Sequence, residues 1–109
     1  MEPKLISYTI VDFQSKQDME LFLRRWEDRK DTWLKKFKDA GMLSNINTQI
    51  WDKENIFRLG RIFTYKDDKS FLNCQKIFRQ FEEENSDIVR KISSSRGIVL
   101  DDNQLSASN

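Results

Sequence analysis

Hydrophobic and polar residues form two different patterns along this chain of 109 residues, one typical of strands and one typical of a helix. The segments 4–13 and 56–65 are rich in β-branched and aromatic residues, which is typical of strands. Between them, apolar residues recur at spacings of three, four and seven, which is the pattern of one face of a long helix. These residues are Met19, Phe22, Leu23, Trp26, Trp33, Leu34 and Phe37.

The predicted first helix carries signals at both ends. Ser15, with Asp18 three residues later, resembles a capping box, and the helix dipole favours an acidic residue at that place. Ala40 and Gly41 supply a stop, because glycine accepts the left-handed conformation that ends many helices. We therefore expect a helix over residues 15–40.

A hairpin is predicted in the middle of the chain. In residues 46–51, as in a short strand, two sets of side chains alternate, Ile46, Thr48 and Ile50 with Asn47, Gln49 and Trp51. The polar turn 52–55 joins this segment to the strand 56–65. A short connection made of turn residues favours a hairpin. Gly60 within the second strand indicates a bulge or a close approach of two backbones. Residues 42–45 are expected to be a connection.

The C-terminal part predicts a second helix and a last strand. The helix should begin at one of three N-cap candidates, Asp67, Asp68 or Ser70. Its apolar face consists of Phe71, Cys74, Phe78 and Phe81. After it we expect a short helical turn at 86–92, a loop at 93–96 and a brief strand at 97–100.

The predicted order is strand, helix, strand, strand, helix, strand. Two split βαβ units of this kind form the ferredoxin-like α+β fold, a four-stranded antiparallel sheet with two helices on one face. The strand 56–65 is apolar on both sides, with Phe57 and Leu59 on one and Ile56 and Ile62 on the other. A sheet face in water normally shows polar residues. We therefore expect a second copy of the chain to cover that face, in a homodimer.

These features resemble the dimeric α+β barrel superfamily, which includes small antibiotic-biosynthesis-type monooxygenases and stress-responsive barrel proteins. The resemblance spans residues 4–101 and depends on the element order, the long first helix with Trp26 and Trp33, and the segment 57–71, FRLGRIFTYKDDKSF. It implies a dimeric α+β barrel, in which two sheets pack together. It also implies that a ligand pocket, where present, lies between the helices and the sheet of each subunit.

Composition narrows the chemistry that the chain can perform. It contains no histidine and one cysteine, Cys74. The isolated chain therefore cannot build a Ser-His-Asp triad, a histidine zinc site, a proximal-histidine haem site or a thiolate cluster. The haem-degrading branch of the superfamily uses a histidine, so that activity is not carried over. We expect no metal and no cofactor.

Charge and hydropathy bear on partners and location. Nineteen basic and eighteen acidic residues leave a net charge of +1, whereas duplex-binding domains usually show a clear basic excess, so we expect no nucleic-acid partner. No stretch approaches the ~18 apolar residues of a membrane span, and the first residues do not resemble a signal peptide. We therefore expect a cytoplasmic protein without a membrane partner. Residues 1–101 should form one domain and residues 102–109 a disordered tail.

Four aromatic residues of the first helix could line a pocket for a small, flat, apolar or aromatic molecule, namely Phe22, Trp26, Trp33 and Phe37. Of these, we take Phe22, Trp26 and Trp33 as candidates for binding a ligand. Helical spacing of aromatic residues is also what core packing alone requires. We favour the core interpretation for this group.

Arg61 is a second candidate, because its position in the strand 56–65 gives it the same face as apolar residues. Burying an unpaired charge is costly, so Arg61 needs a partner. It could hold a carboxylate, phenolate or enolate ligand, with Tyr8 or Tyr65 donating a hydrogen bond nearby. It could equally pair with an acid such as Asp12 across the dimer, and we favour this ion pair.

Two further features favour structural roles. Cys74 lies on the apolar face of the second helix and has no histidine to activate it, so we expect a small buried side chain and not a nucleophile. The charged stretch 24–39 mixes basic residues with tryptophans, as some nucleic-acid surfaces do. Acidic residues are interspersed at favourable helical spacings, which indicates a solvated helix face.

Three functions are compatible with the sequence. The first is a homodimer that binds a small molecule, either as a cofactor-independent monooxygenase-like or isomerase-like enzyme or as a non-catalytic binder, and it depends on fold analogy. The second is an RNA-recognition-type module, which would expose aromatic residues on its central strands. Its expected motif fits the segment 58–65 poorly, and we rank it lower. The third is a structural or interaction dimer.

Overall fold

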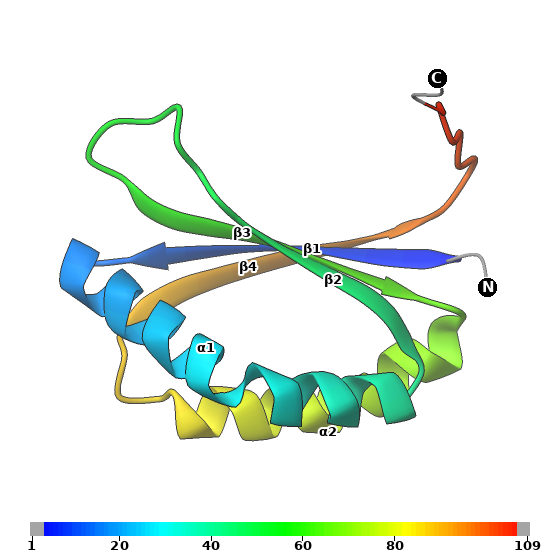
Figure 1. Cartoon of the computed structure of the whole chain (residues 1–109), viewed down its shortest axis with the longest axis horizontal. Helices are drawn as coiled ribbons and strands as arrows, with labels where there is room; N and C mark the ends of the chain where they lie inside the picture. The colour runs from blue at the N-terminus through cyan, green and yellow to red at the C-terminus, as the bar shows by residue number, and fades with distance from the viewer. Residues whose placement is uncertain (1–3, 107–109) are drawn as a thin grey trace.

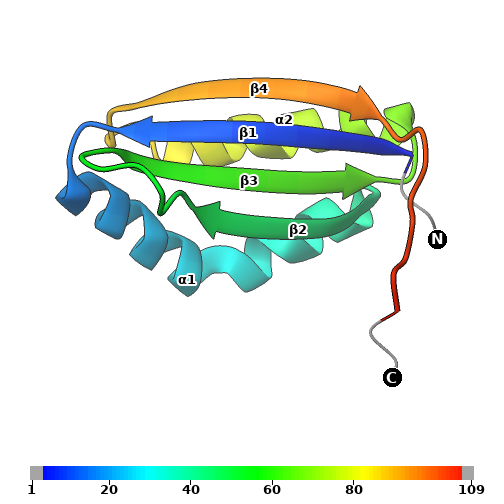
Figure 2. The same ribbon diagram turned by 90° about the horizontal axis from the view of Figure 1, so that it is seen from above.

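The computed structural model describes residues 4–106, and its elements follow the predicted order (Figure 1). The elements are β1 (Leu5–Phe13), α1 (Lys16–Asp39), β2 (Met42–Gln49), β3 (Phe57–Tyr65), α2 (Asp68–Glu84) and β4 (Arg90–Ile98). The strands form one antiparallel sheet in the order β2-β3-β1-β4. Both helices cover the same face of this sheet (Figures 1 and 2). The ferredoxin-like α+β fold is confirmed.

Both helices begin at the kind of residue that the sequence indicates. The Ser15 hydroxyl accepts a hydrogen bond from the Asp18 backbone N–H at 3.1 Å, and the Asp67 carboxylate accepts one from the Ser70 N–H at 2.7 Å. These bonds satisfy backbone donors that the first helical turn leaves without partners. After α1, Gly41 has a φ of +108°, and a Cβ at this position would lie 2.2 Å from Ser70 Oγ. The turn between α1 and β2 therefore requires glycine.

The core lies between the helices and the sheet and is largely aromatic. At its centre, the Phe81 ring of α2 lies edge-on to the rings of Phe22, Trp26 and Trp33 of α1, at centroid distances of 5.7, 6.0 and 5.4 Å. Such geometry adds to the stabilisation from area burial. Trp33 is buried in this cluster and does not line the cavity described below.

The prediction for β2 was wrong at both ends. Residues 42–45 belong to the strand, which ends at Gln49 and not at Trp51. The strand starts with an irregularity between Met42 and Ser44, where the register to β3 shifts. This pairing supplies backbone partners for a segment whose polar sequence shows no strand pattern of its own. Gly60 forms no bulge, but a Cβ there would lie 2.8 Å from Thr48 Oγ1, which is the close approach that glycine permits.

The prediction for the C-terminal strand was also wrong. Residues 86–92 do not form a helical turn and residues 93–96 do not form a loop, because β4 runs without interruption from Arg90 to Ile98. Its register pairs Arg90 with Phe13 and Ile98 with Leu5, so β4 covers the whole free edge of β1. Backbone pairing along this edge overrides the low strand propensity of a serine-rich segment.

The helices cover one face of the sheet, and the other face, the outer face, lies opposite them (Figures 1 and 2). The even-numbered residues of β1 and β3 lie on it, together with their neighbours on β2 and β4. Ile6, Ile10 and Ile62 are half-buried there, whereas Tyr8 is 48% exposed and Ile46 is 55% exposed. The outer face thus carries apolar side chains as well as polar ones, so neither side of the sheet is purely polar.

The chain leaves β4 and extends beyond the outer face (Figure 1). Residues 99–106 form no helix or strand. The disorder expected for residues 102–109 stays a prediction, and residues 107–109 lie outside the described part of the chain.

Candidate functional site

A cavity of about 150 Å³ lies between the sheet and the helices. A cavity of this size accommodates a molecule about as large as benzene. Among the β4 residues that line it, Ser94 and Arg96 are exposed, so the cavity meets solvent along this edge strand. Its lining residues are Ser7, Thr9, Val11, Phe22, Arg61, Phe63, Tyr65, Phe71, Gln75, Phe78, Glu82, Arg90, Ile92, Ser94 and Arg96.

Arg61 is a buried charged residue of this wall, with 6% of the residue exposed. Its Nε donates a hydrogen bond to the Asn47 Oδ1 at 2.8 Å, and Asn47 lies directly opposite on β2. Within the described residues, this is the one hydrogen bond of the guanidinium, and no carboxylate lies within ion-pair distance of it. The two terminal nitrogen groups of Arg61 therefore have no protein acceptor.

Aromatic rings surround the Arg61 guanidinium. Its central carbon lies 4.6 Å from the ring centroid of Trp26, 5.2 Å from Phe63, 5.3 Å from Phe81 and 5.8 Å from Phe22. Rings at these distances attract a cation through their π faces. They stabilise the charge without using any of the N–H donors, which stay available for a hydrogen-bonding ligand.

Burial lowers the pKa of Arg61 to about 10. The negative charge of Glu82 acts against this shift, and the positive charge of Arg90 adds to it. A pKa of about 10 keeps Arg61 protonated at neutral pH. The inner wall of the cavity therefore carries a desolvated positive charge.

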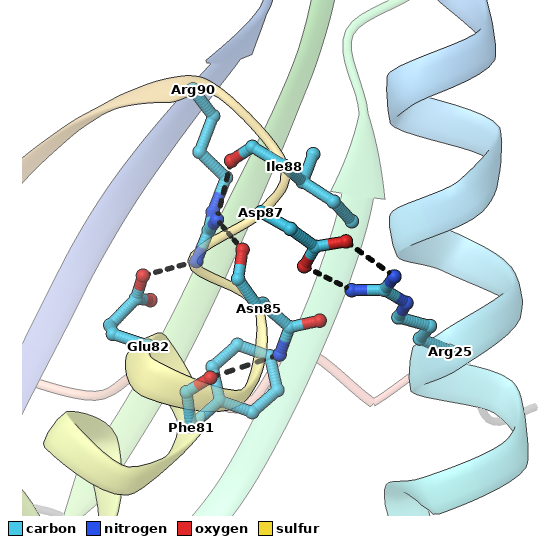
Figure 3. A network of polar contacts seen from close by, with 7 residues as sticks. All are labelled: Arg25, Phe81, Glu82, Asn85, Asp87, Ile88 and Arg90. Atoms are coloured by element: carbon cyan, nitrogen blue, oxygen red, sulfur yellow. Dashed lines mark hydrogen bonds and ion pairs between the residues drawn. The ribbon is translucent and has the colours of Figure 1, made fainter.

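The two terminal nitrogens of Arg90, by contrast, are occupied by partners from its own chain, whereas its Nε is buried without a partner among the described residues (Figure 3). Arg90 forms an ion pair with Glu82 and donates hydrogen bonds to the backbone carbonyls of Asn85 at 2.7 Å and Ile88 at 2.9 Å. Burial raises the pKa of Glu82, while Arg90 and Arg61 oppose that shift. The negative charge of Glu82 thus offsets the positive charge of Arg90. The ion pair and the two hydrogen bonds to backbone carbonyls hold the turn between α2 and β4 in place.

A second ion pair attaches this turn to α1. The Arg25 guanidinium donates two parallel hydrogen bonds to the Asp87 carboxylate, both at 2.7 Å, and the Asn85 amide donates to the Phe81 carbonyl at 2.9 Å (Figure 3). The hydrogen bond from Arg25 lowers the pKa of Asp87. Parallel hydrogen bonds of this kind define geometry as well as adding energy. The turn that carries Arg90 into the cavity wall is therefore held at both ends.

Hydroxyl groups and a third arginine line the rest of the cavity. The Tyr65 hydroxyl is buried without a hydrogen-bond partner among the described residues, and burial raises its pKa. The Thr9 and Ser94 hydroxyls bond to each other at 3.0 Å. Arg96 lies with its guanidinium carbon 4.8 Å from the centroid of the Phe71 ring. The lining combines apolar rings with hydrogen-bond donors and an excess of positive charge.

The structure brings together some of the residues that the sequence indicates. Phe22 and Arg61 line the cavity, and Trp26 contacts Arg61 without being part of the lining. Trp33 belongs to the core. Tyr8 lies on the outer face, on the other side of the sheet from Arg61, because its β3 partner is Ile62.

The favoured ion pair between Arg61 and Asp12 was wrong. Asp12 pairs with Arg58 of the same chain, with Nε of Arg58 2.6 Å from the carboxylate oxygen. Both residues occupy the opposite side of the sheet from Arg61. A partner chain packed on the outer face would therefore bring its own Asp12 no nearer to Arg61.

The contributions of β4 and α2 to the cavity were not predicted from the sequence. Arg90, Ser94 and Arg96 alternate along β4 toward the helices, but a loop was expected over much of that segment. Glu82 was not among the candidate residues. The two arginines and the serine among the residues at every second position from Arg90 to Arg96 are the one signal that could have revealed this face.

Other kinds of site find no support in the described residues. Residues 4–106 contain no group of three or more histidine, cysteine or acidic side chains placed to hold a metal ion. Within the same part of the chain, none of the helices has the length and apolar character needed to cross a membrane.

Comparisons with known proteins agree with this fold. A family model described as a domain of unknown function, DUF6974, matches residues 2–99. A dimeric ferredoxin-like protein from an uncultured marine organism is 30% identical, with a TM-score of 0.84, over 94% of this chain and 100% of that chain. A second dimeric ferredoxin-like protein from an uncultured marine organism is 21% identical, with a TM-score of 0.83, over 94% and 99%.

A more distant similarity is to a monooxygenase. This protein, from the gene ActVA-Orf6 of Streptomyces coelicolor and in complex with the ligand nanaomycin D, is 6% identical, with a TM-score of 0.69, over 95% of this chain and 94% of that chain. The likeness shows a shared fold, as the resemblance to the dimeric α+β barrels implies. None of the curated proteins matches the chain.

Proposed function

Because the chain belongs to the DUF6974 family, which is described as a domain of unknown function, we propose its function from the geometry. The chain forms a homodimer through the outer face of its sheet, and each subunit binds a small molecule in the cavity between the sheet and the helices. One observation carries the binding part of this proposal, namely a buried arginine beside the cavity with no carboxylate partner.

The dimer is supported by the apolar residues that the protomer leaves uncovered. Ile46 and Ile62 lie opposite each other on β2 and β3, and Tyr8 and Ile10 continue this surface onto β1. Complete burial of one isoleucine side chain is worth about 1.5–3 kcal/mol. In a two-fold symmetric interface each residue contributes twice. The 30% identical marine protein is itself described as dimeric.

The free-energy cost of burying the Arg61 charge without a negatively charged partner supports the binding site. A buried charge without a partner is destabilising by several kcal/mol, whereas an apolar side chain of similar size would pack without that cost. A ligand with acceptor atoms would use the free donors of Arg61 and fill the space next to it. The related fold of the monooxygenase that holds nanaomycin D is consistent with a ligand in this layer.

The RNA-recognition alternative is disfavoured by the direction of the aromatic side chains. Phe13, Phe63 and Tyr65 of the central strands are buried against the helices, and Phe57 packs against the same core. Of the aromatic residues on β1 and β3, Tyr8 is the one on the outer face. A single half-exposed ring does not make a surface on which successive bases stack.

A pair of neighbouring serines allows the two parts of the proposal to be tested separately. Ser94 lines the cavity, whereas Ser95 pairs with Tyr8 on the outer face. Small neutral aromatic probes, benzamide and benzyl alcohol, should shift the amide NMR signals of residues around the cavity in the wild-type protein. S94F should abolish these shifts and keep the dimer, because its ring fills the cavity.

S95F should have the opposite effect. Its ring points to the outer face, so it should weaken the dimer while the probes still bind. If no small aromatic probe, neutral or anionic, binds the wild-type protein at millimolar concentration, the binding proposal fails. If S95F and S94F have the same effect on self-association, the assignment of the outer face to the dimer fails.

A further inference from the structure

We infer that the ligand is a small organic anion, a carboxylate, phenolate or enolate on a body about the size of one aromatic ring, and that Arg61 holds its charged oxygen. This inference rests on the proposed function, since it specifies the chemistry of the molecule in the same cavity. Three features of the cavity support it, namely the balance of charges, the free donors and the volume.

The charges that line the cavity do not balance. Arg61, Arg90 and Arg96 face one acid, Glu82. Glu82 pairs with Arg90, which is further occupied by two backbone carbonyls. Arg96 is exposed at the edge, where water can solvate it. The unbalanced charge inside the protein is therefore that of Arg61, and one negative charge from a ligand would neutralise it.

The donors of Arg61 favour a planar anion. Asn47 uses the Nε group alone, so both terminal nitrogens are left for a ligand. The planar guanidinium fork matches the two oxygens of a carboxylate, and such charge-assisted bonds are roughly twice as strong as neutral ones. The four surrounding rings orient the guanidinium but supply no acceptor. The geometry is that of a preorganised site for an anionic oxygen.

The volume and the apolar part of the lining set the size of the ligand. About 150 Å³ is enough for one ring and its substituent. Val11, Phe22, Phe63, Phe71 and Phe78 supply apolar contacts beside the charged end. Inorganic phosphate or sulfate would leave this apolar surface without a partner. An anion with a ring-sized apolar body uses both parts of the cavity.

Benzoate and benzamide make a direct test, because they have nearly the same shape and differ in charge. Both are titrated into the 109-residue chain at neutral pH and low salt, with binding followed by calorimetry and by amide NMR shifts. We expect benzoate to bind at least about tenfold more tightly than benzamide. R61Q should remove this preference and keep benzamide binding.

R24Q is the matched control. Arg24 is exposed on α1 and does not line the cavity, so its loss changes the net charge by the same amount without touching the site. The preference for benzoate should persist in R24Q. If it is lost there to the same extent as in R61Q, the effect comes from net charge and the assignment to Arg61 is overturned.

Competition in the wild-type protein keeps the test decisive even if R61Q does not fold. Acetate should displace benzoate, and acetamide should not, since acetate alone carries the charge. If benzamide binds as tightly as benzoate, the inference of an anion is wrong, while binding of small molecules stands. If neither ring compound binds, both the inference and the proposed binding function are wrong.

Discussion

Replacing Tyr65 by phenylalanine should make the free protein more stable. The Tyr65 side chain is completely buried, with its ring edge-on to Phe71 at a centroid distance of 5.4 Å. Its hydroxyl has no hydrogen-bond partner among the described residues. In the unfolded chain the same hydroxyl is solvated by water. Folding therefore removes a polar group from water without replacing its hydrogen bonds.

The size of the effect follows from that loss. A buried donor or acceptor without a partner costs about 1–3 kcal/mol. Phenylalanine preserves the ring contacts and removes the hydroxyl, and the small void left by one oxygen atom costs part of the gain. We expect Y65F to raise the free energy of unfolding by about 1 kcal/mol, which corresponds to about 4 °C in Tm for a domain of this size.

Urea unfolding at fixed protein concentration, followed by tryptophan fluorescence, measures this change. Thr32→Val is the control, because it removes a hydroxyl from a side chain that is exposed on α1, away from the outer face and the cavity; its effect should stay within about 0.5 kcal/mol. A loss of about 1 kcal/mol or more in Y65F would refute the reasoning, because the hydroxyl would then be hydrogen-bonded in solution, for example to a water in the cavity.

Three further predictions concern the core and the titratable groups. Phe81→Ala removes the ring that joins α1 to α2 and should lower the free energy of unfolding by about 3–5 kcal/mol in the same urea experiment; a loss below 1 kcal/mol would contradict the packing. Burial raises the pKa of Cys74 to about 11. Its contribution to stability is therefore complete below its ordinary pKa near 9 and decreases as the pH rises toward 11, so wild type should lose stability over this range more steeply than Cys74→Ala. The hydrogen bond from Arg25 lowers the pKa of Asp87, so this contribution is present above the ordinary value of 3.8 and is lost as the pH falls. Asp87→Asn should flatten the acid limb of the stability curve, and an unchanged slope would show that the pair has no effect in solution.

The elements that the sequence predicts well are those with local signals. Ser15 and Gly41 define the ends of α1 because capping depends on residues within one turn of the helix end. Strand β4 forms because β1 offers it a free edge, and that edge is distant in the sequence. The first residues of β2 join the sheet because Met42 pairs with Tyr65 at the far end of β3. The polar residues of β2 and β4, such as Ser44 and Ser94, do not form a sequence pattern that predicts a strand.

The site was predicted in part for the same reason. The position of Arg61 within its strand showed that it shares a face with apolar residues, which is a local property. That Tyr8 lies on the other face from Arg61 depends on the register between β1 and β3, which pairs Tyr8 with Ile62. The roles of Arg90 and Arg96 depend on β4 being a strand, so they could not be predicted once a helical turn was expected at 86–92 and a loop at 93–96.

The proposed function depends most on a second copy of the chain covering the outer face of the sheet. Sedimentation equilibrium at micromolar concentration tests this directly, on wild type and on Ile46→Lys, whose side chain is exposed enough in the protomer for lysine to leave the fold intact. We expect wild type to have twice the 13.1 kDa mass of one chain and Ile46→Lys to shift toward 13.1 kDa. A wild-type protein of 13.1 kDa at these concentrations would contradict the account.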